Sequence, residues 1–422
     1  MTDLIKKWRG FIPLLLIYLL ITIFLSKNIY QGDESRYVNF SKNILNGYYA
    51  NPDLKPGFLW NGPGYPIIIA PFTYFKAPSI YLKLLNSIFL FFGVILLYKS
   101  LRFKLNHNKS LILSYISGLT HPYFFLSITL ILTESLAFFL ISLSLYSFIR
   151  FSYYKKKKDL LVFSLSSGFL ILTKVFFSYV FLLCGIISIF LWTVSRNKKK
   201  LRYLLKLSLT PFLICLPYLF YTYSLTGKIF YWSDAGGSAL YPMSTPYEGE
   251  YGDWFPSKES IGVLNKSRTA TFKKNTLKEN HLGFIKSLSE LNGVEKDQRL
   301  KEKAIENIKS NNFKFFRNII YNFGRVSIRY PFTNREIKPL FLLLFTFHFL
   351  LLLIPLLVSI KKIIFKLIYP NIIILTFFSI FLMETLILSS DSRFIFPIYP
   401  ILIYIISTLF SDKKTNEHTS FT

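Results

Sequence analysis

The chain has 422 residues, of which 52% are hydrophobic and 18% aromatic, and its mean hydropathy is +0.40. These values lie above those of soluble domains and are typical of an integral membrane protein. Fifty lysines and arginines against 22 acids give a formal charge of +28. Much of this charge lies in short blocks between apolar segments. That placement favours membrane topology and anionic lipid headgroups over nucleic-acid binding as its explanation.

Apolar segments near the length needed to cross a bilayer recur along the chain. We expect an all-α polytopic membrane protein with about ten transmembrane helices, at residues 10–26, 79–98, 110–128, 131–152, 159–174, 176–194, 203–224, 339–360, 367–388 and 394–410. The first segment resembles a signal peptide, but no small-residue cleavage site follows it, so we expect a retained span. The run at 64–76 is short and interrupted by proline, which favours a re-entrant or interfacial element.

The basic blocks between these segments all fall on one side of the membrane if the ten spans are real. By the positive-inside rule this side is cytoplasmic. We therefore expect a multipass protein of the cell (inner or cytoplasmic) membrane with both termini in the cytoplasm. Its predicted parts are an N-terminal transmembrane module (1–224) with an outer loop at 27–64, an extracytoplasmic region (225–338), and C-terminal helices with a short cytoplasmic tail (339–422).

Within the 225–338 region, the part from 231 to 256 is rich in Gly, Pro, Ser and aromatic residues and is predicted as an ordered loop. Apolar residues recur at helical spacing from 295 to 310, which predicts an amphipathic helix. A second amphipathic helix is expected around 315–325, lying on the membrane surface.

An acidic pair, Asp33-Glu34, follows the first span, and Arg36 follows the pair. Two solvated loop carboxylates are the plainest interpretation of such a pair. Its position beside the membrane and the return of the chain through the 62–66 turn favour a chemical role instead. A carboxylate can take the proton of a weakly nucleophilic hydroxyl, and a nearby cation can hold the charge of a departing phosphate. We therefore predict Asp33 and Glu34 as catalytic residues and Arg36 as a phosphate-binding residue.

Three further cations lie near predicted outer ends of spans: Lys174, Arg329 and Arg393. A cation at this depth binds phosphate or extends to lipid headgroups. Because a membrane-anchored phosphate needs cations there, we predict all three as donor phosphate-binding residues.

Glu134 begins the fourth span, where an acid either is paired in a functional site or interacts with the helix dipole. His121 precedes it; a lone histidine is more often a packing residue than a metal ligand. The two cysteines lie in apolar stretches, and no clear metal-binding motif is visible. We assign no cofactor, and a divalent metal stays an open alternative.

Several short motifs stand in a fixed order relative to the spans: 33–37 (Asp-Glu-Ser-Arg-Tyr), 63–66 (Pro-Gly-Tyr-Pro), 132–136 (Leu-Thr-Glu-Ser-Leu), 168–174 (Gly to Lys), 216–218 with 226–228, and Arg393-Phe394 with Pro397 and Pro400. In this order the chain resembles the C-type (GT-C) membrane glycosyltransferases, which include protein O-mannosyltransferases and lipid A aminoarabinose transferases. The sequence departs from the family pattern at Lys174, where arginine is usual, and it lacks the Glu-Lys-Pro-Pro stretch of the aminoarabinose transferases.

The resemblance implies a GT-C fold and a polyprenyl-phosphate sugar donor. It further implies transfer on the extracytoplasmic face to a lipid, glycan or protein acceptor of the cell envelope, with inversion at the anomeric centre. The residue at Asp33 would be the general base, Arg36 would contact donor phosphate, and Glu134, His121 and Tyr65 would line the cavity. Aromatic residues of 231–254 would shape the acceptor groove or anchor at the membrane interface. The rival interpretations are a transporter or flippase for a lipid-linked saccharide, and an inactive scaffold member of the family.

Overall fold

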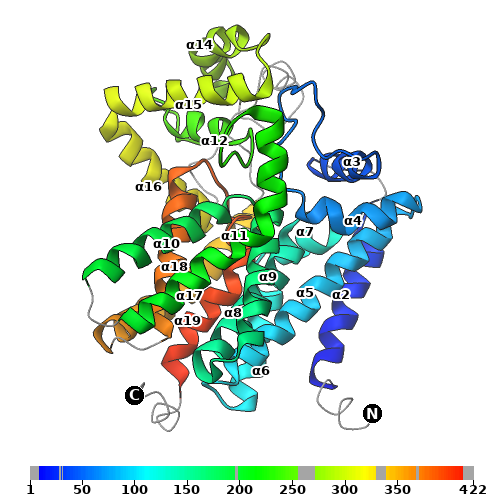
Figure 1. Cartoon of the computed structure of the whole chain (residues 1–422), viewed down its shortest axis with the longest axis vertical. Helices are drawn as coiled ribbons and strands as arrows, with labels where there is room; N and C mark the ends of the chain where they lie inside the picture. Colours follow the sequence, from blue (N-terminus) through cyan, green and yellow to red (C-terminus); the bar gives the residue numbers. More distant parts are fainter. Residues whose placement is uncertain are drawn as a thin grey trace.

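The structure is a computed structural model that describes residues 9–27, 30, 32–194, 198–254, 271–328, 339–366 and 370–411 (Figure 1). In these residues all regular elements are helical. The longer helices are α2 (Ile12–Leu25), α3 (Glu34–Leu45), α4 (Gly64–Tyr74), α5 (Ser79–Leu101), α6 (His107–Leu119), α7 (Tyr123–Thr129), α8 (Glu134–Tyr154), α9 (Lys157–Thr173), α10 (Phe177–Val194), α11 (Lys198–Thr226), α12 (Gly236–Met243), α14 (Thr271–Ser287), α15 (Gly293–Ser310), α16 (Asn312–Ile328), α17 (Pro339–Lys366), α18 (Asn371–Ile387) and α19 (Tyr399–Ile406).

Helices occupy each of the ten predicted span ranges, with one break. The range 110–128 is divided into α6 and α7, which meet at an angle of 68°. Pro122 lies at this break. Its ring and its missing N–H prevent the helix from continuing out of the preceding turn. Four of the described helices are long and apolar enough to cross a bilayer by themselves, or five if the bent pair counts as one span. The others are shorter, so full crossing at all ten ranges stays a prediction.

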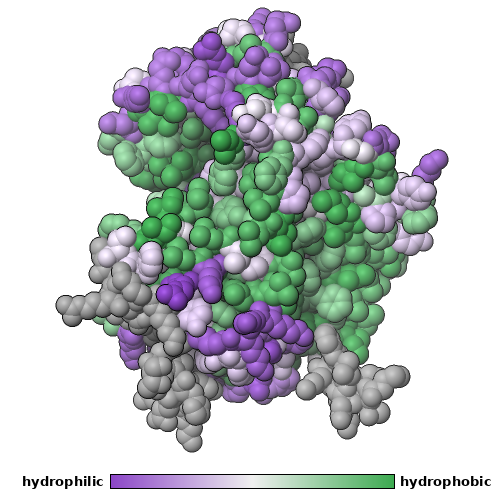
Figure 2. Space-filling view, viewed as in Figure 1, coloured by the Kyte–Doolittle hydropathy of each residue, from purple (hydrophilic) through white to green (hydrophobic). Residues whose placement is uncertain are grey.

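The helical bundle has an apolar surface belt with polar residues above and below it (Figure 2). On α17, for example, Leu343, Phe347 and Ile354 are each at least 65% exposed. Such large exposed apolar side chains are stable in contact with lipid tails rather than water. The protein is therefore a multipass membrane protein.

Inside the bundle, small residues let neighbouring helices approach closely. A Cβ on Gly93 of α5 would lie 2.6 Å from the Phe138 ring on α8, and one on Gly168 of α9 would lie 2.6 Å from Ile214 on α11. Ser144 and Ser166 share a hydrogen bond of 2.8 Å between α8 and α9. Glycine and serine at helix contacts are typical of packing in membranes. These contacts hold α8 and α9 closely against each other and against α5 and α11.

We use "the cap" for α12, α14, α15 and α16, which lie together at one end of the bundle (Figure 1). The helix predicted at 295–310 is confirmed as α15, whose start is capped by Asn292 accepting from Val294 N and Glu295 N. A helix is also present around 315–325, as α16, whereas its position at a membrane surface stays a prediction. The loop prediction for 231–256 is wrong over α12, a helix that starts with two glycines and contains Pro242. The three-part division of the chain also stays a prediction.

Candidate functional site

A pocket of about 700 Å³ lies where α3, the α9–α10 junction, α12 and the end of α18 meet. Asp33, Arg36, Lys174 and Arg393 all line it. The fold therefore brings together four predicted site residues that are up to 360 positions apart in the chain. Arg329, the remaining predicted phosphate-binding residue, lies outside the described residues.

The charged groups at one end of this pocket form a continuous network. Arg393 donates from Nη1 to Asp33 Oδ2 (2.9 Å) and from Nε to Glu134 Oε1 (2.6 Å). Lys174 Nζ donates to the same Glu134 oxygen at 3.0 Å. Arg36 Nη1 lies 3.4 Å from Asp33 Oδ1. Three cations thus share two carboxylates, and the cationic side chains keep contact with the pocket while Glu134 is 1% exposed.

Helix ends place each of these groups. Asp33 is the N-cap residue of α3, so Arg36 follows one turn later. Lys174 is the C-cap residue of α9, in an extended conformation that turns its side chain off the helix axis. Arg393 lies in the turn after α18, where its N–H donates to Asp391 Oδ1 at 2.8 Å. The three cations therefore come from the first turn of α3, the C-cap of α9 and the turn that follows α18.

The glycines of the 62–64 turn allow this turn to touch the end of α9. A Cβ on Gly62 would lie 2.1 Å from the Leu172 carbonyl oxygen, and one on Gly64 would lie 2.5 Å from Thr173 Oγ1. No side chain fits at either distance. Glycine is therefore required at both positions for the turn to pack against the end of α9, next to Lys174.

Two buried residues of α16 hold two segments that carry pocket residues. Asn322 Nδ2 donates to the carbonyls of Thr385, Leu386 and Leu388 at 3.1, 3.0 and 2.7 Å. Arg325, 1% exposed, donates to the carbonyls of Ser390, Tyr251 and Gly252 at 2.9–3.1 Å. The apolar stripe in the sequence predicts a helix here but does not predict this role of its polar residues, because a buried arginine leaves no local signal in the sequence.

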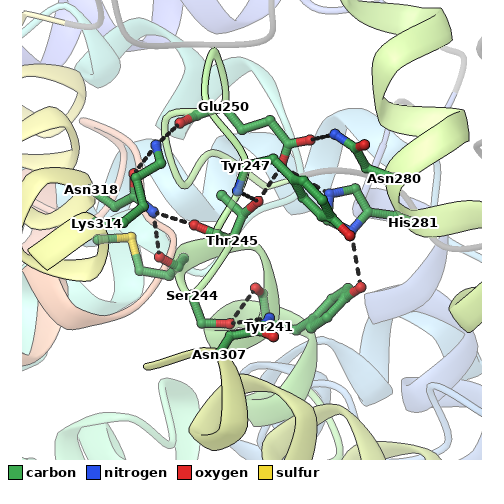
Figure 3. A network of polar contacts seen from close by, with 11 residues as sticks. Tyr241, Ser244, Thr245, Tyr247, Glu250, Asn280, His281, Asn307, Lys314 and Asn318 are labelled. Carbon is green, nitrogen blue, oxygen red and sulfur yellow. Dashed lines mark hydrogen bonds and ion pairs between the residues drawn. The ribbon is translucent and has the colours of Figure 1, made fainter. Parts of the chain in front are cut away.

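The segment 244–250, which follows α12, is held against the cap helices by a network of polar contacts (Figure 3). Glu250 accepts from His281 Nε2 at 2.9 Å and from Asn280 Nδ2 at 2.8 Å, and it also bonds the Thr245 hydroxyl. Tyr241 OH bonds the other ring nitrogen of His281 at 2.9 Å. Burial raises the pKa of Glu250, but these hydrogen bonds outweigh it and hold that pKa below its usual value. The network is enclosed, which indicates a structural link and not a second site.

Glu34, predicted as catalytic with Asp33, has a different environment from its neighbour. Its side chain is 0% exposed; Oε1 accepts from Ile131 N at 2.8 Å and lies 3.6 Å from Lys83 Nζ. A carboxylate with no exposed surface cannot reach a substrate, so we correct the expectation for Glu34 to an anchor of α3.

The three residues expected on the cavity wall do not line the pocket. Glu134 lies behind Lys174 and Arg393 as their shared partner. Tyr65 is fully buried and its hydroxyl donates to Asn86 Oδ1 at 3.1 Å. His121 is 3% exposed in an aromatic cluster with His348, 5.1 Å away between ring centroids. The sequence indicates that these three residues lie near the site, but it does not indicate in which direction each side chain points.

Of the aromatic residues expected to shape a groove, Trp232 and Trp254 line the pocket, together with Trp60, which sequence analysis did not single out. The Arg36 guanidinium lies 5.0 Å from the Trp60 ring centroid, a cation–π distance. Among the described residues, no group of three or more His, Cys, Asp or Glu side chains is placed to hold a metal ion.

Comparisons with known proteins bear on the family and on the fold. The sequence model of the family of dolichyl-phosphate-mannose-protein mannosyltransferase matches residues 7–229, more than half of the chain. The fold is similar to that of the archaeal oligosaccharyltransferase AglB from Archaeoglobus fulgidus, solved in complex with an inhibitory peptide and a dolichol-phosphate, with a TM-score of 0.51 at 14% identity.

That similarity covers 96% of this chain and 50% of AglB, so the chain spans half the length of the archaeal enzyme. ArnT from Cupriavidus metallidurans, bound to undecaprenyl phosphate, is matched over 95% of this chain and 78% of its own, with a TM-score of 0.42 and 11% identity. No curated protein matches the sequence significantly.

Proposed function

Because the chain belongs to the dolichyl-phosphate-mannose-protein mannosyltransferase family, we propose that it transfers a sugar from a polyprenyl-phosphate-linked donor to a lipid, glycan or protein acceptor. The resemblance to GT-C glycosyltransferases and the all-α membrane fold expected from the sequence are confirmed by the family match and by the fold of AglB. The observation that carries the proposed reaction is Arg393, which contacts Asp33 and Glu134 at once beside Lys174.

In the proposed reaction, the oxygen of an acceptor hydroxyl attacks the anomeric carbon of the donor, and Asp33 accepts the proton of that hydroxyl. The new C–O bond forms while the bond from the anomeric carbon to the phosphate oxygen breaks, which inverts the anomeric centre. The electron pair leaves with the polyprenyl phosphate. Arg36, Lys174 and Arg393 hold the charge that develops on this phosphate, because they line the same pocket as the base.

Donor and base compete for the same cations in this site. Asp33 is contacted by two guanidinium groups: Arg36 lies beside Oδ1 and Arg393 beside Oδ2, so both carboxylate oxygens already have a cationic partner. A phosphate that attracts these groups would release Asp33 for the incoming hydroxyl. Donor binding would therefore activate the base.

We place the pocket on the extracytoplasmic side of the cytoplasmic membrane, because the basic blocks of the sequence predict the opposite end of the bundle to be cytoplasmic. The donor would then approach from the outer leaflet with its prenyl chain in the bilayer. Both termini would be cytoplasmic.

The test compares envelope glycans, by mass spectrometry, from cells that lack the chromosomal gene and carry either wild-type protein or Asp33→Asn. We expect a glycosyl increment with wild-type protein and its loss with Asp33→Asn at equal protein level. Asp53→Asn is the matched control, because Asp53 lies in the same segment but pairs only with Lys55 in the described structure. Equal glycans from wild-type and Asp33→Asn cells would refute the base and favour a flippase or scaffold.

A further inference from the structure

Five residues that line the pocket have buried polar atoms with no hydrogen-bond partner in the described part of the chain. One of them is Thr133, before the start of α8. We call the other four the hydroxyl wall; their unpaired atoms are Asn61 Oδ1, Trp232 Nε1, Ser389 Oγ, and Glu384 Oε1 and Oε2. More than nine in ten buried polar groups in folded proteins are paired. A concentration of unpaired atoms on one pocket therefore indicates a ligand that completes them.

Contacts between neighbouring side chains show that this wall is continuous. The Trp232 ring lies 5.3 Å from Phe230, whose ring lies 6.2 Å from Tyr179. Tyr179 and Glu384 line the pocket from the facing helices α10 and α18. Phe176 of the α9–α10 junction lies 5.1 Å from Phe381, one turn before Glu384.

The other two members adjoin these elements. The Ser233 hydroxyl donates to the Trp60 carbonyl at 3.1 Å. Because Ser233 follows Trp232 and Asn61 follows Trp60, this bond holds the segments that carry Trp232 and Asn61 together. Ser389 N donates to the Ala239 carbonyl at 3.0 Å, which ties the end of α18 to α12. The wall thus runs from the 60–62 turn past α10 to the end of α18.

The hydrogen-bonding capacity of these atoms defines the ligand group they fit. The Trp232 indole N–H only donates, whereas the Asn61 carbonyl oxygen only accepts. A ligand that completes the wall must therefore offer both acceptors and donors. Hydroxyl groups do both, whereas an ammonium offers no acceptor and a carboxylate offers no donor.

We propose that the hydroxyl wall binds hydroxyl groups of the transferred sugar. This assignment rests on the proposed glycosyl transfer and adds to it the residues that recognise the sugar. Three of the four residues, Trp232, Glu384 and Ser389, lie in a part of the chain beyond the matched range 7–229. Their role therefore comes from this structure and not from the family match.

The experiment measures binding of two lipids with the same prenyl chain to protein in lipid nanodiscs: polyprenyl phosphate and polyprenyl-phosphate mannose. The variants are Glu384→Gln, which keeps the shape and replaces the carboxyl group by an amide, and Trp232→Phe, which removes the N–H. Each should weaken binding of the mannose lipid about fivefold, as expected for one lost or weakened hydrogen bond. Both should leave polyprenyl phosphate within twofold of wild type. Met383→Leu, next to Glu384 but 53% exposed, is the control.

Equal weakening of the mannose lipid and of polyprenyl phosphate would overturn the proposal, because the residues would then act on the fold or on phosphate binding. Wild-type protein that binds the mannose lipid no better than polyprenyl phosphate would overturn it as well. The proposed reaction is tested separately by Asp33→Asn. If that variant kept its glycan product while the wall variants behaved as expected, the subsite would stand and the reaction would fall.

Discussion

Glu134→Gln removes the negative charge that Lys174 and Arg393 share. The carboxylate is 1% exposed and receives bonds of 3.0 and 2.6 Å from cations that are 13% and 25% exposed. Loss of one partner from a fully buried pair costs about 3–5 kcal/mol. The cations here keep some contact with solvent, and the glutamine carbonyl still accepts one hydrogen bond. We therefore expect a loss of about 2–3 kcal/mol in the free energy of unfolding.

A phosphate ligand should restore part of this loss, since it supplies the missing negative charge to both cations. If its affinity rises about tenfold in Glu134→Gln, saturating polyprenyl phosphate adds about 1.4 kcal/mol more to the variant than to wild type. The measurement is the ligand-induced rise in the midpoint of thermal denaturation in nanodiscs. We expect a larger rise for the variant.

The control is Asp159→Asn, which removes a buried acid bonded to Arg150 Nε at 2.8 Å near the other end of α9. This variant should lose stability and keep the wild-type response to the ligand. A ligand-induced rise in Glu134→Gln that equals or falls below the wild-type value would refute the proposal that the phosphate binds to Lys174 and Arg393.

Three further predictions concern the residues around this network. Gly62→Ala should lower transfer activity at least tenfold in an in vitro assay, because its Cβ would lie 2.1 Å from the Leu172 carbonyl and must displace the end of α9. Glu34→Gln should lower the free energy of unfolding by about 3 kcal/mol in a denaturation series, because it leaves the buried Lys83 ammonium without its carboxylate. Burial raises the pKa of Asp234 to about 6. The folded protein thus binds this proton more tightly than the unfolded chain, and its stability falls as pH rises from about 4 through 6; Asp234→Asn should flatten that part of the stability–pH curve.

Hydropathy was sufficient to predict the helices of the bundle, because lipid selects long apolar segments that need no tertiary information. The break at Pro122 was not predicted, since the apolar run continues through it. The cap helix α12 was missed because Gly-Gly and Pro242 have the composition of a loop, whereas contacts with α15 stabilise it: Gly237 N donates to Asp297 Oδ1 at 2.6 Å.

The candidate site was predictable as a set of charges near helix ends, but not residue by residue. Asp33 and Glu34 are adjacent at the start of α3, where successive residues point about 100° apart around the helix. One therefore meets Arg393 across the pocket and the other meets Lys83 in the interior. Hydrophobic periodicity likewise located α16, but an apolar stripe does not say what the polar face contacts. In this helix the polar face, with Arg325, packs inward.

The charges of the site also explain why a base and a phosphate site would share one arginine. In the proposed reaction the donor phosphodiester carries one negative charge, and the departing phosphate monoester carries up to two. Asp33 changes in the opposite sense, from one negative charge to none as it takes the proton. The total negative charge of Asp33 and the phosphate is therefore nearly constant, while one negative charge moves from the carboxylate to the phosphate. An arginine that already bridges Asp33 and Glu134 can follow that movement without leaving the pocket. A lysine at this position offers no planar fork to hold two anions in fixed directions.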